Sequence, residues 1–181
     1  MRYRAQNSIG WGPYSDITYI LAATVPLAPP EPTYVDSTST YITLNIPRSL
    51  DDAGSPITGY KIFVDSGDDF TSSYNQVIGY NSQISYAVTG LVTGKVYRFI
   101  TCATNLYGNS DFSLEVIAGL GNKPPAPSAP TRDISLYSEE SMLISWGDVT
   151  ASDLPVLGYV LEMDDGFGGL FSKVYDGLNN P

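Results

Sequence analysis

The stretch that most constrains the fold is residues 84–108, ISYAVTGLVTGKVYRFITCATNLYG. It predicts a strand, a turn at Gly90 and Gly94, and a second strand. Because side chains of a β-strand point alternately to its two faces, the second strand has two distinct faces. One face carries Tyr97, Phe99, Thr101 and Ala103, and the other carries Arg98, Ile100, Cys102 and Thr104. This alternation, rich in β-branched and aromatic residues, predicts a half-buried strand of an all-β protein.

Leu91 and Tyr97 stand six residues apart across the bend. This spacing resembles the tyrosine corner of fibronectin type III modules, in which the Tyr hydroxyl bonds to the backbone near the turn. The resemblance implies an immunoglobulin-like, seven-stranded antiparallel β-sandwich. It also predicts a hydrogen bond between the Tyr97 hydroxyl and the backbone of residues 91–94.

Two other parts of the chain repeat this plan at a nearly constant spacing, which predicts a tandem array of such modules. Asn7, Gly10 and Ser15 match Asn105, Gly108 and Ser113 at an offset of 98 residues. Met142, Ile144 and Trp146 match Ile42, Leu44 and Ile46 at an offset of 100, and Gly158-Tyr159 matches Gly59-Tyr60 at an offset of 99. The first set resembles the F–G hairpin of the family, and the other sets resemble its strands B and C.

Two proline-rich stretches, VPLAPPEP at 25–32 and NKPPAPSAP at 122–130, separate these parts. Proline fixes φ and lacks a backbone N–H, so it prevents strand pairing across a joint. The expected domains are residues 1–24 as the C-terminal part of one module (strands F and G, with G at 16–22), 25–121 as a complete module, and 122–181 as the N-terminal part of a third (strands A to C′, with C′ at 170–175).

In the complete module, strands are expected near residues 42–46, 60–64, 74–78 and 86–88. Ile46 occupies the position where the family usually carries Trp, and the third part has that residue as Trp146. Burial of each large apolar side chain contributes about 1.5–3 kcal/mol. The predicted core contains Ile42, Leu44, Ile46, Tyr60, Ile62, Val64, Val88, Leu91, Tyr97, Phe99 and Ala103.

Charge and composition disfavour several classes of partner. Nineteen acidic residues against nine Lys and Arg give a net charge of −10, which repels nucleic acid and anionic membrane surfaces. The apolar run 17–29 is too short to cross a bilayer and contains a proline, so we expect no membrane insertion. No secretory signal peptide is expected at Met1, which strand-like sequence follows at once.

The chain contains no histidine and one cysteine. It therefore lacks the usual general base and any Ser–His or Cys–His pair, and no disulfide can form within it. Clustered aspartates raise two alternatives, a calcium site and a glycosidase carboxylate pair, but their spacing lacks the alternating ligands of a calcium loop. We expect solvated turn residues, no cofactor and no enzymatic activity. These aspartates are Asp51, Asp52, Asp65, Asp68, Asp69, Asp164 and Asp165.

Five residues are candidates for contact with a partner protein. Trp11 and Tyr107 are expected at loop tips, where aromatic side chains give a large contact area at low entropy cost. Phe63, Ile100 and Cys102 share the outward phase of their strands, which predicts an exposed apolar stripe. The alternatives are packing of the loop aromatics against a neighbouring module, and a half-buried Cys102 that acts as a small hydrophobe. An RGD tripeptide is absent from the sequence, which gives no support for integrin binding by that route.

The resemblance implies a non-enzymatic segment of a long array that spaces and binds other proteins. Three settings remain open: an extracellular or cell-surface adhesion scaffold, an intracellular cytoskeletal or ciliary filament scaffold, and an accessory module of a secreted polysaccharide-acting enzyme. Family habit favours the first, while the unpaired cysteine and the absence of glycosylation sequons favour the second. The two partial modules are expected either to be completed by flanking sequence or to assemble head to tail with other chains by strand complementation.

Overall fold

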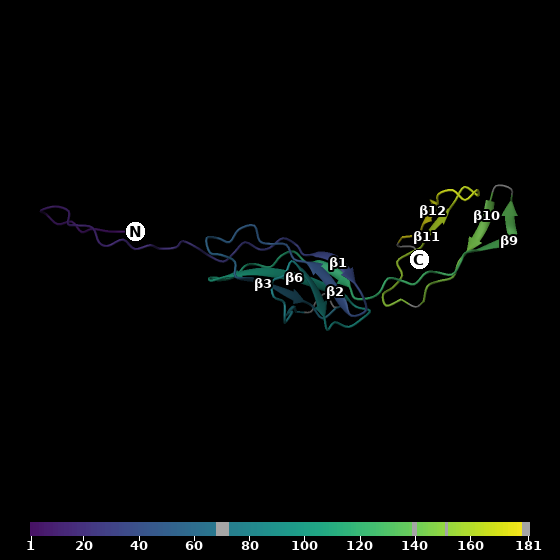
Figure 1. The fold of residues 1–181 in the computed structure, drawn as a ribbon, viewed down its shortest axis with the longest axis horizontal. Coiled ribbons are helices and arrows are strands. Elements are labelled where there is room, and N and C mark those ends of the chain that lie inside the picture. The colour runs from purple at the N-terminus through teal and green to yellow at the C-terminus, as the bar shows by residue number, and fades with distance from the viewer. Residues whose placement is uncertain (68–72, 139–140, 151, 179–181) are drawn as a thin grey trace.

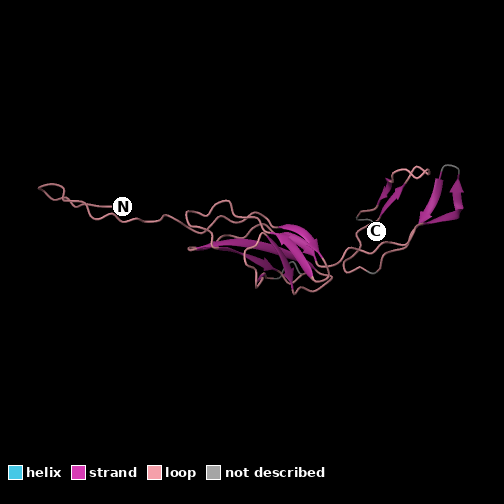
Figure 2. Ribbon diagram, in the orientation of Figure 1, coloured by secondary structure: helices cyan, strands magenta, loops and turns pink. Residues whose placement is uncertain are grey.

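The computed structural model describes residues 1–67, 73–138, 141–150 and 152–178. Within these residues it contains strands, turns and loops but no helix. Figure 1 shows three parts in a row: an N-terminal hairpin, a central sandwich, and two hairpins that end the chain. Strands are concentrated in the second and third parts (Figure 2). The predicted all-β, immunoglobulin-like fold is confirmed.

The central sandwich consists of two antiparallel sheets. One sheet has the order β1-β2-β5, and the other has the order β4-β3-β6, with β7 and β8 both pairing with β6. The strands are β1 (Thr33–Ser37), β2 (Tyr41–Asn45), β3 (Gly59–Val64), β4 (Asn75–Gln76), β5 (Ser85–Thr89), β6 (Val96–Asn105), β7 (Gly108–Asn109) and β8 (Val116–Gly119). This order places β2 and β5 on one side of the core and β3 and β6 on the other.

The core lies between the two sheets and follows the predicted phase. Ten of the eleven predicted core residues are buried, and Leu91 is partly buried against them. Phe99 and Ile62 are fully buried, and Phe99 pairs with Val64 across β6 and β3. Because a shift of one residue would turn every side chain of a strand to the opposite face, these positions confirm the register that the sequence predicts.

The bend between β5 and β6 is held by Tyr97. Its hydroxyl accepts a hydrogen bond from the Val92 N–H at 2.8 Å and donates to the Val92 carbonyl at 3.2 Å. The predicted bond to residues 91–94 is therefore confirmed. Gly90 and Gly94 take φ values of 77° and 82° in this turn, a region that side-chain-bearing residues rarely adopt.

The last strand of the module is divided into β7 and β8 by a serine-bonded segment. Ser110 and Ser113 donate their N–H groups to the Ala103 and Thr101 carbonyls, each at 2.8 Å. Their hydroxyls accept the Ala103 and Thr101 N–H groups, each at 3.0 Å. Serine side chains thus replace part of the backbone ladder, which is why one expected strand G appears as two short strands.

The N-terminal hairpin repeats this serine pattern. Tyr3 donates its N–H to Ser15 Oγ at 3.2 Å, and Ser15 donates its N–H to the Tyr3 carbonyl at 2.8 Å. The expected strand at 16–22 is wrong, because the structure assigns no strand there. Its counterpart β8 pairs with Val96–Phe99, and at the offset of 98 only Met1 of that partner lies in the sequence. Met1 accepts one bond from the Thr18 N–H.

The C-terminal part contains two antiparallel hairpins, and their assignment as strands A–B and C–C′ of a third module remains a prediction. They are formed by β9 (Thr131–Ser138) with β10 (Ser141–Ser145), and by β11 (Val160–Met163) with β12 (Ser172–Asp176). Trp146 lies between Tyr159 and Tyr175, with ring centroids 6.5 and 5.8 Å away. The expected C′ strand at 170–175 thus corresponds to β12, shifted towards the C-terminus.

Candidate functional site

Trp11 directly follows the turn of the N-terminal hairpin, where it forms a β-bridge with Gln6, and is 56% exposed. The Arg4 guanidinium lies 4.5 Å from its ring centroid and 4.7 Å from that of Tyr14. Arg2 lies over the other aromatic ring, 3.9 Å from the Tyr14 centroid. A guanidinium over an aromatic ring is attracted by the ring quadrupole, so this stack fixes the ring of Trp11 while more than half of its surface remains exposed.

Tyr107 lies at the turn between β6 and β7 and is 46% exposed. Its N–H donates to Asn105 Oδ1 at 2.8 Å, which orders the turn. Leu106 beside it is 83% exposed, and Val25 of the upstream linker lies close to Gly108. Trp11 and Tyr107 therefore have the expected exposed, loop-tip positions, and their contact with a partner remains a prediction.

The expected exposed stripe of Phe63, Ile100 and Cys102 is wrong. Ile100 is 7% exposed and Cys102 is 1% exposed, and burial raises the pKa of the Cys102 thiol although the Lys61 ammonium opposes this. Phe63 is half-buried and makes an edge-to-face contact with Phe112, with ring centroids 5.1 Å apart.

Phe112 is the residue that sequence reasoning missed on this face. It is 53% exposed and belongs to the serine-bonded segment between β7 and β8. The repeated serines at 15 and 113 were a signal for that segment, but strand phase alone does not place Phe112 against Phe63. This face therefore presents Phe112 to solvent, and Ile100 and Cys102 lie beneath its surface.

Aspartate side chains in the loops of the central sandwich accept hydrogen bonds from the backbone of the same loops. Asp51 Oδ1 accepts the Ala53 N–H at 2.8 Å, and Asp52 Oδ1 accepts the Gly54 N–H at 2.9 Å. Asp65 is buried, and its Oδ2 lies 2.8 Å from Arg98 Nε. The ion pair with Asp65 raises the pKa of Arg98. Two more aspartates of this cluster, Asp68 and Asp69, lie outside the described residues.

The acidic loop of the C-terminal part is also occupied by backbone donors. Asp165 Oδ1 accepts the Phe167 N–H at 2.9 Å and the Gly169 N–H at 3.1 Å, and these bonds lower the pKa of Asp165. Asp164 Oδ1 accepts the Gly166 N–H at 3.0 Å. Across the part of the chain that the structure describes, no three Cys, Asp or Glu side chains group closely enough to hold a metal ion.

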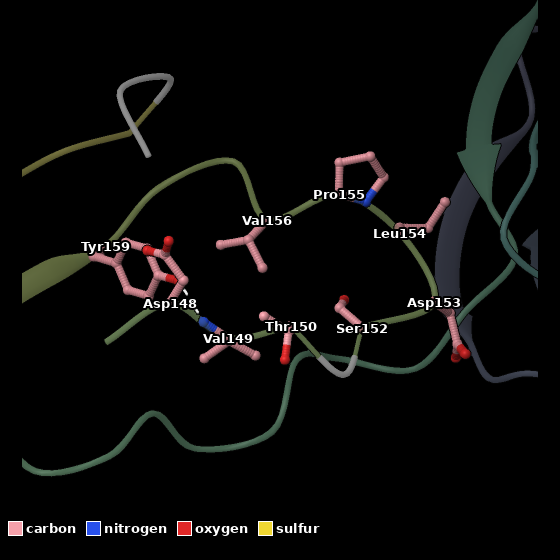
Figure 3. Close-up of a pocket in the computed structure, with 9 residues that line it drawn as sticks. All are labelled: Asp148, Val149, Thr150, Ser152, Asp153, Leu154, Pro155, Val156 and Tyr159. Carbon is pink, nitrogen blue, oxygen red and sulfur yellow. Dashed lines mark hydrogen bonds between the residues drawn. The ribbon is translucent and has the colours of Figure 1, made fainter. Parts of the chain in front are cut away.

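A shallow, open hollow of about 550 Å³ lies inside the loop that joins β10 to β11. Figure 3 shows Val156 and Tyr159 directed into it, with the Tyr159 hydroxyl accepting the Val149 N–H at 2.7 Å. The same bond occurs in the central sandwich between the Ser49 N–H and the Tyr60 hydroxyl at 3.0 Å. Asp153 and Leu154 lie at the end of the loop nearest the central sandwich (Figure 3), which makes this loop part of a joint between modules.

No described helix is long and apolar enough to cross a membrane.

No family model matches the chain. Curated relatives do: a chicken fibronectin type-III domain-containing protein 3a is 32% identical over 189 residues, which cover 97% of this chain and 15% of the relative. The human protein 3A is 28% identical over 97% of the chain and 15% of the relative, and the mouse protein 3C1 is 31% identical over 68% of the chain and 8% of the relative.

Solved structures show the same fold. A crystal structure of a titin segment aligns with a TM-score of 0.50 and 24% identity, over 55% of this chain and 34% of that one. A human FNIII domain solved in solution aligns with a TM-score of 0.51 and 14% identity, over 69% of this chain and all of that one. The chain thus spans about 15% of the length of the curated relatives that match most of it.

Proposed function

Because the chain is built from tandem fibronectin type III modules, we propose that it is a non-enzymatic segment of a longer array that spaces and binds other proteins. The observation that carries this proposal is the serial arrangement of its three parts (Figure 1), in which the two end parts repeat different portions of the central residue plan at offsets of 98 to 100. Repetition along one axis makes a long surface from small units, which suits a spacer better than a catalyst.

The surfaces offered to partners are its exposed aromatic side chains. Trp11, Tyr107 and Phe112 are each between 46% and 56% exposed, and each stands on a hairpin of the F–G type. Aromatic side chains dominate the energy of protein contacts, so a partner that spans the first two modules would meet Trp11 on one and Tyr107 and Phe112 on the other. The partner class proposed is another protein, including neighbouring modules or chains of the same kind.

An adhesion or cell-surface scaffold is the setting that we propose for this array. Its test is the location of the full-length protein, determined by surface biotinylation of intact cells and by fractionation. Recovery in the biotinylated fraction is the expected result. Recovery in the detergent-insoluble cytoskeletal fraction would instead support a filament scaffold, and retention on a polysaccharide matrix would support an enzyme-accessory role.

Partner binding is tested by crosslinking the 181-residue chain, carrying a photoreactive group beside Tyr107, to a surface protein fraction. Tyr107→Ala and Phe112→Ala should each lower the yield of crosslinked partner several-fold. Leu114→Ala is the matched control, because Leu114 is a 76% exposed residue of the same segment without an aromatic ring. Equal yields from all three variants would contradict the proposed aromatic contacts.

A further inference from the structure

The two joints that flank the central sandwich are built from corresponding residues. At the upstream joint, residues 22–24 contact the loop at 51–54, which follows β2. At the downstream joint, residues 119–122 contact Asp153 and Leu154 in the loop that follows β10. The two linker segments correspond at the offset of 98, and the two loops correspond at the offset of 100. The same pair of positions therefore meets twice along the chain.

Each joint contains a hydrogen bond between the same two positions. The Thr24 N–H donates to the Ala53 carbonyl at 3.1 Å. At the downstream joint, the Asn122 N–H donates to Asp153 Oδ2 at 2.8 Å, and Asn122 Nδ2 adds a second bond to that oxygen at 3.1 Å. The donor is thus the backbone N–H of the corresponding residue at both joints. The acceptor differs, because a side-chain carboxylate replaces the backbone carbonyl at the downstream joint.

The next residue of the loop and the preceding residue of the linker also pack closely at both joints. Upstream the glycine is in the loop, and downstream it is in the linker. Upstream, Gly54 faces Ala23, and a Cβ added to Gly54 would lie 3.5 Å from the Ala23 Cβ and 2.8 Å from the Ala22 carbonyl oxygen. Downstream, Leu154 faces Gly121, and a Cβ added to Gly121 would lie 3.3 Å from the Leu154 Cγ and 2.9 Å from the Asp153 Cβ. A glycine on one side therefore accommodates a side chain on the other.

Further contacts hold each loop on a second side. At the upstream joint, Asn105 Nδ2 donates to the Thr24 carbonyl at 2.7 Å and to the Asp52 carbonyl at 3.2 Å. At the downstream joint, the turn at Gly94 lies so close that an added Cβ would be 2.9 Å from the Asp153 carbonyl oxygen. Contacts on two sides of a loop oppose bending in more than one direction, and the adjoining prolines stiffen the linker further.

From these paired contacts we infer that the loop after the second strand of each module interlocks with the end of the module before it, and so holds successive modules at a fixed angle. The partner of this surface is a neighbouring module of the same kind. The inference rests on the proposed spacer function for its purpose, because an array of set length needs joints that do not bend. The geometry of the joint is measured without any external partner, so its failure is distinguishable from failure of partner binding.

The test is the distance distribution between two nitroxide labels across the downstream joint, one at Ala87→Cys on β5 and one at Thr150→Cys in the loop. Both positions are exposed, whereas Cys102 is buried and buried thiols react poorly. We expect one narrow distance peak in the parent chain. Gly121→Ala should broaden and shift this peak, because the nearest atoms to the added methyl all belong to Asp153 and Leu154.

The double variant Gly121→Ala/Leu154→Gly reproduces the Ala–Gly pairing of the upstream joint. It removes the contact with Leu154 but keeps the 2.9 Å approach to the Asp153 Cβ, so it should narrow the peak relative to Gly121→Ala. The circular dichroism melting temperature of the central sandwich should stay unchanged in both variants. A peak that is already broad in the parent chain, that does not change in Gly121→Ala, or that is as broad in the double variant as in Gly121→Ala would overturn the inference.

Amide hydrogen exchange gives a second measurement that needs no label. The Asn122 amide should exchange at least tenfold more slowly than the Lys123 amide, and Asp153→Ala should abolish that difference. Asp111→Ala is the matched control, since it removes an exposed carboxylate from the segment between β7 and β8 of the same chain. Equal exchange of the Asn122 amide in the parent chain and in Asp153→Ala would contradict the interlock.

Discussion

The central sandwich and the C-terminal part use the same strand plan with different results. β2 and β10 carry apolar residues at an offset of 100, yet Ile42 is fully buried and Met142 is 56% exposed. Likewise β3 begins with Gly59-Tyr60 and β11 directly follows the matching Gly158-Tyr159. Val64 is 9% exposed, but Met163, its counterpart at an offset of 99, is 50% exposed. The residue pattern is alike, so the difference arises from what packs on it.

Packing of two sheets face to face accounts for this difference. β2 lies between β1 and β5 in one sheet, and β3 lies between β4 and β6 in the other. The apolar faces of the two sheets pack on each other in a shared core that includes Ile42 and Ile62. Among the described strands, β10 pairs with β9 alone and β11 with β12 alone. A two-stranded hairpin is at best marginally stable by itself. The strand pattern is thus sufficient to specify hairpins, whereas a core requires the strands that close the sandwich.

The largest expected effect is a difference in stability between the two parts. The only tryptophans, Trp11 and Trp146, lie outside the central module, so tryptophan fluorescence reports on the ends and circular dichroism mainly on the sandwich. In urea, Trp146 fluorescence of a Trp11→Phe variant should change well before the main circular dichroism transition. The expected gap is about 5 kcal/mol, a typical stability for a complete small domain. Coincident transitions would show that the C-terminal part folds as one unit with the sandwich.

Loss of the central aromatic core residue should have the next largest effect. Phe99→Ala removes a fully buried side chain and should lower the free energy of unfolding of the sandwich by about 3–5 kcal/mol, measured by urea denaturation followed by circular dichroism. Phe167→Ala removes the same ring from a position that is 94% exposed. This control should change the free energy of unfolding by less than about 0.5 kcal/mol. A comparable loss in both variants would contradict the proposed difference between the central sandwich and the C-terminal part.

Removal of the corner hydroxyl should have a smaller effect. Tyr97→Phe keeps the buried ring but loses the two hydrogen bonds to the Val92 backbone, so the free energy of unfolding should fall by about 1 kcal/mol. Tyr107→Phe removes the hydroxyl of an exposed loop residue and serves as the control. An unchanged denaturation midpoint in Tyr97→Phe would mean that the corner does not stabilise the bend.

The smallest change in stability is expected from a substitution in β10, which has no second sheet packed on it among the described strands. Met142→Ala should change the main unfolding transition by less than about 0.5 kcal/mol, because its side chain is more than half exposed and surface substitutions rarely do more. At the corresponding central position, Ile42→Ala should cost about 2–5 kcal/mol. Similar losses in the two variants would show that β10 contributes to a core of its own.

Much of the fold was predictable because it depends on local patterns. Alternation along 96–105 identified the buried face of β6, and the spacing from Leu91 to Tyr97 identified the corner. Matching positions at a fixed offset identified the repeated hairpins, including the N-terminal turn that carries Trp11. The absence of a strand at 16–22 was not predictable from these residues alone. Pairing there depends on a partner strand, of which the sequence contains one residue.

The local order of residues is enough to specify which face of each strand is apolar, since side-chain direction alternates with every residue. The packing of whole elements decided what covers the other face. Ile100 and Cys102 have the outward phase but are buried, because the segment between β7 and β8 brings Phe112 against Phe63 over that face. It also decided the joints, where Gly121 meets Leu154 across a proline-rich linker. Contacts between segments distant in sequence depend on the packing of whole elements, which no local pattern records.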